Sequence, residues 1–350
     1  MKQRVSMRDL ARIAKVSHVT VSKALRNDPK ISLATRRRIQ ELAQKQAYRP
    51  DPLLRALAEY RRDRRTRAYQ ATLAWLDFYP QPHGMDRILD FRQYREGAMA
   101  RAQELGYKLE IIAPGQSRLG DDALKRILLA RGIQGLLLPP QPHDNAVLTH
   151  DFAEFTAVTF GFSLKQPQFH LITNHQFHSS ALAARVLREY GYRRIALMLT
   201  QQTDERSLHN FLGGFLTEQA QWPASHRVPH LVFDEKEGNE RDVQPYLPWI
   251  RRHKPDAILT SSLPATRDLL NMAGLRIPDD VAMAGTAVPD AGRAGINQNS
   301  IEIGRVAVDT LIGMLYRNER GVPAIAHRIL IDGYWQDGPT APDKRREGTG

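Results

Sequence analysis

Between residues 71 and 285, short apolar runs alternate with stretches of amphipathic helical period. Eight runs stand out: ATLAWLDF (71–78), KLEIIA (108–113), GLLLPP (135–140), AVTFGF (157–162), RIALML (194–199), PHLVFD (229–234), DAILTS (256–261) and DVAMAG (280–285). Buried strands alternating with helices are typical of βαβ units and parallel sheet. About ten strands exceed one compact sheet, so the pattern predicts two α/β lobes with a cleft. Ligands of such folds bind at the carboxyl ends of the strands.

The positive charge of the chain is confined to its first fifth. Residues 1–67 contain nineteen Lys and Arg against six Asp and Glu, whereas residues 68–350 contain 31 against 32. A basic segment on an otherwise balanced protein is the electrostatic footprint of a polyanion-binding surface. A disordered solubilising tail is the alternative, but such a tail lacks the apolar periodicity that this segment has.

The basic segment carries the signals of three short helices. Ser6, Ser17 and Ser32 each stand where a helix N-cap is expected, and the helices should end near residues 14, 25 and 46. Their inner faces are predicted to carry Leu10, Ile13 and Ala14, then Val21 and Leu25, then Ile39, Leu42 and Ala43. Three short helices with a tight entry into the second predict a helix-turn-helix.

A short helix starting at Asp51 and Pro52 and the charged run RRDRRTR (61–67) follow these helices. We therefore divide the chain into a helix-turn-helix domain (1–50), a hinge helix with basic linker (51–67), a two-lobed domain (68–338) and a disordered tail (339–350). No window is apolar enough for a membrane span and no secretory leader is evident, so we expect a cytoplasmic protein associated with the nucleoid.

The common signatures of enzymes and cofactor sites do not occur in the sequence. There is no GxGxxG, P-loop, GxSxG or HExxH pattern, and no cysteine. We therefore expect no enzyme activity and no cofactor. His175 and His178 are spaced so that they share a helix face as metal ligands would, but the sequence offers no third ligand, so we expect no metal site.

Residues 6–57 resemble the N-terminal module of the lac repressor family of bacterial transcription regulators. The resemblance rests on VSHVTVSK (16–23), SLATRRRI (32–39), YRP (48–50) and a hinge segment that ends in Leu57. REGAMARAQELGYKLEI, LREYGYRRIALM, RIPDDVAMAG and IGRVAVDTLIGML look like the family's regulatory domain. The resemblance implies a type I periplasmic-binding-protein-like fold after the head. It also implies a homodimer that binds a near-palindromic DNA operator, with repression as the default.

The resemblance also implies which side chains contact DNA. His18, Val19 and Lys23 would face base edges, and Leu57 with Leu54 would enter the minor groove at the centre of the site. Tyr48 of the YRP motif is a further candidate. The candidates that would face phosphates or adjacent bases are Arg8, Ser17, Ser22, Arg26, Lys30, Ser32 and Thr35. Lysine can donate to guanine and valine can contact a thymine methyl, although Val19 packed on the third helix is the alternative. Lys15 replaces the family's frequent turn glycine, which predicts a strained residue with positive φ.

The regulatory lobes lack the family's usual sugar anchors, because Phe211, Ser262-Leu263 and Ala287 stand where polar anchors are common. A sugar buried without polar partners is destabilised, so we expect a carbohydrate-related small molecule bound in a different way. Our candidate effector residues are Asp77, Gln141, Phe211, Ser261, Ser262, Asp290 and Gln298; Gln298 matches a family pocket position. Two alternatives stay open: a regulator without effector whose lobes only dimerise, and a sugar- or nucleoside-binding protein or enzyme on the same fold.

Overall fold

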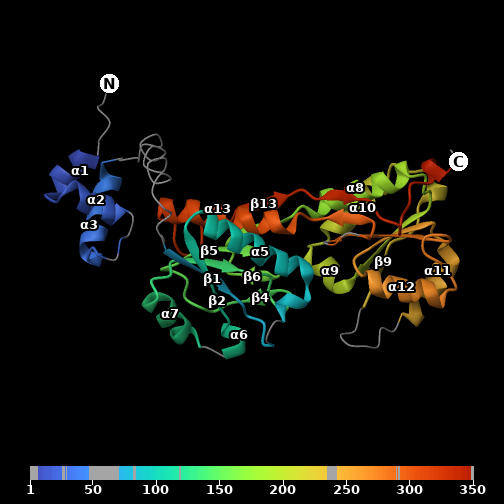
Figure 1. Ribbon diagram of the computed structural model, residues 1–350, viewed down its shortest axis with the longest axis horizontal. Coiled ribbons are helices and arrows are strands. Elements are labelled where there is room, and N and C mark those ends of the chain that lie inside the picture. The colour runs from blue at the N-terminus through green and yellow to red at the C-terminus, as the bar shows by residue number, and fades with distance from the viewer. Residues whose placement is uncertain are drawn as a thin grey trace, which may run out of the picture.

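The computed structural model describes residues 7–25, 28, 30–46, 71–81, 84–117, 120–234, 243–288, 290 and 292–347. It shows a small helical head and two α/β lobes placed end to end (Figure 1). Among the helices of these ranges, none has both the length and the apolar character needed to span a bilayer.

The head consists of α1 (Met7–Ala14), α2 (His18–Leu25) and α3 (Leu33–Lys45), as the sequence predicts. Leu10, Val21 and Ile39, one from each helix, are completely buried at its centre. One expectation is wrong: Ile13 is 46% exposed, and Ala11 is buried instead. In so short a helix only the face around Leu10 is covered by both neighbouring helices.

The first lobe is built on a six-stranded parallel sheet in the order β13-β7-β5-β3-β1-β2. Its strands are β1 (Ala71–Leu76), β2 (Tyr107–Ile112), β3 (Gly135–Leu138), β5 (Thr156–Phe160), β7 (His170–Asn174) and β13 (Arg328–Ile331). Helices α5 (Leu89–Glu104) and α13 (Ser300–Arg317) cover one face around Trp75, and α7 (Asp121–Ala130) covers the other around Leu136. Smaller elements are η1 (Met85–Arg87), α6 (Pro114–Ser117), β4 (Ala146–Val147) and β6 (Leu164–Gln166).

The second lobe has a sheet in the order β14-β12-β11-β10-β8-β9, in which only β14 is antiparallel to its neighbour. Its strands are β8 (Ile195–Thr200), β9 (Leu231–Phe233), β10 (Ala257–Thr260), β11 (Ala282–Gly285), β12 (Gly295–Asn297) and β14 (Tyr334–Gln336). Helices α8 (Gln176–Glu189) and α10 (Asn210–Gln219) cover one face, and α11 (Leu247–His253) and α12 (Leu263–Met272) the other. The remaining elements are α9 (Gln201–Arg206), η2 (Ala224–His226), η3 (Gln244–Tyr246) and α14 (Lys344–Glu347).

The chain passes between the lobes in three crossover segments. Residues 174–176 join β7 to α8, residues 297–300 join β12 to α13, and residues 331–334 join β13 to β14. The segments are hydrogen-bonded to one another: the His175 amide donates to the Ile331 carbonyl at 2.9 Å, and Asn299 Nδ2 donates to the Asp332 carbonyl at 2.7 Å. They therefore form one hinge.

Each of the eight apolar runs overlaps a strand of these two sheets, so the prediction of two parallel α/β lobes is confirmed. The prediction of a disordered tail is wrong for residues 339–347. Ala341 is buried in the core of the second lobe, and the Tyr192 hydroxyl donates to the Pro342 carbonyl at 2.8 Å. The edge strand β14 carries the chain back onto this lobe, so tertiary contacts order a segment whose composition alone favours disorder.

Candidate nucleic-acid interface and effector site

The turn between α1 and α2 fixes the start of the candidate reading helix. The amides of Lys15 and Val16 donate to the carbonyls of Arg12 and Ala11 at 3.2 and 3.1 Å, which is a Schellman motif. Lys15 occupies its left-handed position with φ 51°, as predicted. A lysine in place of the usual glycine makes this turn strained.

Serine hydroxyls cap the two helices that follow. Ser17 Oγ accepts from the Thr20 amide at 3.0 Å at the start of α2. Ser32 Oγ accepts from the Thr35 amide at 3.3 Å at the start of α3. Both serines are exposed, so the positive ends of both helices are open to a phosphate.

The two sides of α2 differ as the sequence predicts. Val21 and Ala24 are completely buried against the other helices, whereas Val19 is 56% exposed. Ser22 and Lys23 are half-buried at the margin of the outer face. An apolar side chain this exposed contributes little to the core of the head, so Val19 is available for an external contact.

The other candidate DNA contacts are placed only in part. Lys30 is exposed and Thr35 is half-buried. The remaining predictions fall outside the described residues. They concern the side chains of Arg8 and His18, the hinge helix and linker, and the residues Arg26, Tyr48, Leu54 and Leu57.

In the second lobe, polar candidates gather at the carboxyl ends of adjacent strands. Ser261 follows β10, and its Oγ accepts from the Thr200 amide at the end of β8 at 2.9 Å. Gln298 follows β12, and its Nε2 donates to the Thr286 carbonyl after β11 at 3.1 Å. Ser262 is buried and caps α12. The sheet thus brings these residues to one edge, although their polar groups already have partners within the chain.

In the first lobe, Asp77 and Gln141 follow β1 and β3 and are both buried. Asp77 Oδ1 accepts from the Tyr79 amide at 2.9 Å, which stabilises the loop after β1. Gln141 Nε2 donates to the Pro139 carbonyl at 2.7 Å, and the backbone amide of Gln141 donates to Ser163 Oγ at 2.7 Å. These side chains shape the strand ends that face the second lobe.

Phe211 requires a correction. It lies in the hydrophobic core of the second lobe and is only 4% exposed, because this face of α10 packs on α8. We therefore remove Phe211 from the effector site. Asp290 lies exposed in the loop after β11, where its carbonyl accepts from Gln336 Nε2 at 2.7 Å.

Arg206, which our reading of the sequence missed, links the two lobes directly. From the end of α9 it donates through Nη2 to the Gln141 carbonyl at 2.9 Å, and its Nη1 lies 3.2 Å from Asp144 Oδ1. Its guanidinium also lies over the Phe91 ring, 6.0 Å from the ring centre. Burial raises the pKa of Asp144 above its ordinary value, and Arg206 opposes that shift. The position of QQTDER directly after a strand end was a signal that could have identified it.

Comparison with known proteins agrees with this architecture. The family model of bacterial regulatory proteins of the lacI family matches residues 6–51, and that of the periplasmic-binding-protein-like domain matches residues 184–334. The HTH-type transcriptional regulator AglR of Rhizobium meliloti is 24% identical over 287 residues, which cover 80% of this chain and 76% of AglR.

Two solved structures have the same fold over nearly the whole chain. The complex of the transcriptional regulator CelR with cellobiose matches with a TM-score of 0.56 and 18% identity, covering 96% of this chain and 100% of CelR. The lac repressor dimer bound to operator and the anti-inducer ONPF matches with a TM-score of 0.55 and 19% identity. The match covers 97% of this chain and 100% of the lac repressor chain.

A helix-turn-helix head followed by two parallel α/β lobes defines a DNA-binding regulator with a periplasmic-binding-protein-like core. The chain belongs to the LacI family of bacterial transcriptional regulators. This family is not enzymatic, so the enzyme alternative is set aside. The resemblance seen in the sequence is confirmed.

Proposed function

We propose that this protein is a repressor that binds a near-palindromic operator as a homodimer, with α2 of each head in the major groove. The observation that carries the proposal is the exposed Val19 beside Lys23 on a capped, basic helix. Valine matches a thymine methyl and lysine matches the guanine acceptors, so the pair suits a base edge better than water.

The small size of the head supports the proposed dimer. One short helix contacts only a few base pairs, and helix-turn-helix proteins gain affinity by placing two heads on half-sites about 34–36 Å apart. The related lac repressor binds its operator as a dimer, which supports the same assembly here.

We also propose that a carbohydrate-related small molecule binds between the lobes. The supporting observations are the polar strand ends of both lobes and the cellobiose bound by the related CelR. A ligand that binds one lobe arrangement better than another shifts the population toward that arrangement. The new lobe arrangement then changes the spacing of the two heads and so the affinity for the operator.

A second candidate is a regulator without an effector. It is favoured by Arg206, which already bridges the lobes, and by Ser261 and Gln141, whose polar groups bond within the chain. In that case the lobes serve only to dimerise.

The DNA-binding proposal is tested by selecting bound DNA from a random library with the purified full-length protein. We expect an enriched inverted repeat, two protomers per duplex by light scattering, and less transcription in vitro from a promoter that contains the repeat. Failure to enrich any sequence at moderate salt would contradict operator binding, and unchanged transcription would contradict repression.

The effector proposal is tested by a thermal-shift screen over sugars, sugar phosphates, uronic acids and nucleobases. We expect at least one compound to raise the melting temperature and to change operator affinity. If no compound does so while the operator still binds, the effector-free candidate is correct.

A further inference from the structure

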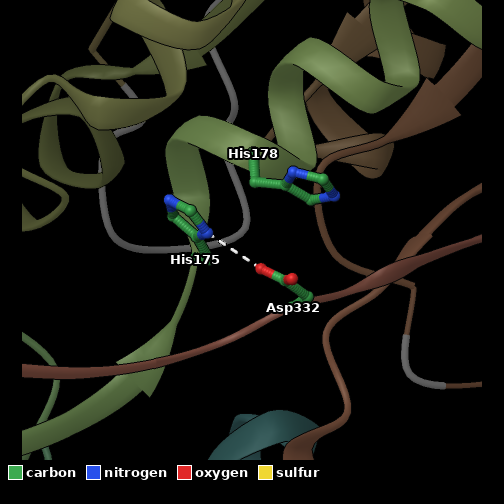
Figure 2. Close-up of side chains that lie close together, drawn as sticks. All are labelled: His175, His178 and Asp332. Carbon is green, nitrogen blue, oxygen red and sulfur yellow. Dashed lines mark hydrogen bonds and ion pairs between the residues drawn. The ribbon is translucent and has the colours of Figure 1, made fainter.

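We propose that His175, His178 and Asp332 form a binding site for a divalent transition metal ion of the zinc class at the hinge between the lobes (Figure 2). His175 and His178 belong to the start of α8, and Asp332 lies in the crossover segment after β13. The site goes beyond operator and effector binding and does not depend on either.

The three side chains converge closely. Their candidate ligand atoms all lie within 4.8 Å of one another. His175 Nδ1 is 2.8 Å from Asp332 Oδ1, and the two imidazole rings stack with their centres 5.5 Å apart. In a tetrahedral zinc site the ligand atoms lie about 3.3 Å apart, given metal–ligand bonds of about 2.0–2.2 Å. Small side-chain rotations therefore bring all three to one ion.

The backbone that carries these ligands is held in place. The His175 amide donates to the Ile331 carbonyl at 2.9 Å, and Asn299 Nδ2 donates to the Asp332 carbonyl at 2.7 Å. Gly333 approaches its neighbours so closely that a Cβ there would lie 2.7 Å from Ile296 Cγ2 and 2.8 Å from the Asn297 carbonyl. All three crossover segments thus fix the positions of the ligands before an ion binds.

The ligand set selects the class of ion. Two imidazole nitrogens with one carboxylate suit Zn²⁺ and its neighbours in the first transition row, whereas Mg²⁺ and Ca²⁺ prefer oxygen ligands throughout. The three protein ligands leave a fourth position for water. A bound ion would tie the first crossover segment to the third and so restrain the hinge.

The competing explanation is a simple hydrogen-bonded pair. Asp332 is favoured near the positive end of α8, and its contact with His175 needs no metal. His178 distinguishes the two cases, because the pair is complete without it whereas a metal site needs it.

The test uses untagged full-length protein, freed of metal with a chelator, and titrated with Zn²⁺ in competition with a chromophoric chelator. We expect Zn²⁺ binding that His178→Gln and Asp332→Asn each weaken at least about tenfold, since even indirect partners of a metal ligand cost 10–100-fold. His209→Asn is the matched control: His209 Nδ1 makes the same 2.8 Å contact with Asp204 Oδ2, so this variant should bind Zn²⁺ like the wild type.

Melting curves of the metal-free variants establish that each is folded before titration. Absence of competitive Zn²⁺ binding by the wild type would overturn the proposal. So would unchanged affinity in either His178→Gln or Asp332→Asn, because the ion would then not be held by all three side chains.

Discussion

Arg206 of the second lobe donates a hydrogen bond to the backbone carbonyl of Gln141 in the first lobe, at 2.9 Å. The same guanidinium pairs with Asp144, and only 17% of the Arg206 side chain is exposed. A partly buried, charge-assisted contact of this kind favours the lobe arrangement in which it forms.

We predict that Arg206→Ala shifts the lobes toward more open arrangements. A hydrogen bond to a charged group contributes about 1.5–3 kcal/mol. The ratio of the lobe arrangement that contains the Arg206 contact to more open arrangements should therefore fall by about tenfold or more. Small-angle scattering should report a larger radius of gyration. Arg185→Ala is the control, since Arg185 pairs with Glu218 within the second lobe; equal scattering from both variants would rule out the bridge.

Lys15→Gly should stabilise the head. Glycine removes the cost of a side chain at φ 51°, for a net gain of about 0.5–1 kcal/mol after its larger backbone entropy is counted. Hydrogen exchange of the α1 and α2 amides in the full-length protein measures the effect. We expect slower exchange there and unchanged exchange in the lobes; faster exchange in α1 would show that the lysine is not strained.

Glu104 should make the stability of the first lobe depend on pH in the acidic range. Hydrogen bonds from Arg305 and Arg101 lower the pKa of Glu104 to about 2 from its ordinary 4.5. The stabilisation is therefore present above pH 4.5 and is lost as the pH falls toward 2. Glu104→Gln should melt below the wild type at pH 7, and the difference should shrink across this range.

The control for this prediction is Glu96→Gln. Glu96 Oε1 lies 3.6 Å from Arg92 Nε on the same helix, and among the described residues no ion pair joins it to a second element. Its melting difference from the wild type should stay small at every pH, and a pH-independent difference for Glu104→Gln would refute the assignment.

Lys30 and Val19 should affect DNA binding in different ways. If Lys30 contacts a phosphate, Lys30→Ala removes one such contact from each head of the dimer. It should therefore reduce the slope of log affinity against log salt by about 1.8, about 0.9 per contact, and weaken binding to all sequences alike. Val19→Ala should leave the slope unchanged and reduce discrimination between operator and unrelated DNA. Val147→Ala, an equally exposed valine in the first lobe, should change neither quantity.

The head was predictable because its signals are local. Ser17 and Ser32 each cap a helix by accepting a hydrogen bond from the backbone amide three residues later. The helical period alone places Val19 on the outer face of α2. Strands β12 and β14 were missed because each has only three residues, and β7 (HLITN) because polar residues interrupt its apolar ones. Strand β13 pairs with β7, which lies 157 positions earlier in the chain. The same holds for the links between lobes: Arg206 is 65 residues from Gln141, and Asp332 is 157 residues from His175. Spacing within a window cannot find such pairs.

The most direct test of the DNA-binding account is the affinity of full-length Lys23→Ala for the selected operator, measured by fluorescence anisotropy at fixed salt. We predict a loss of about 1–3 kcal/mol for each half-site of the operator, with a smaller loss on unrelated DNA. Lys108→Ala, an exposed lysine of the first lobe, makes the same change in net charge and should bind like the wild type. Equal operator affinity for Lys23→Ala, Lys108→Ala and the wild type would contradict the assignment of α2 as the reading helix.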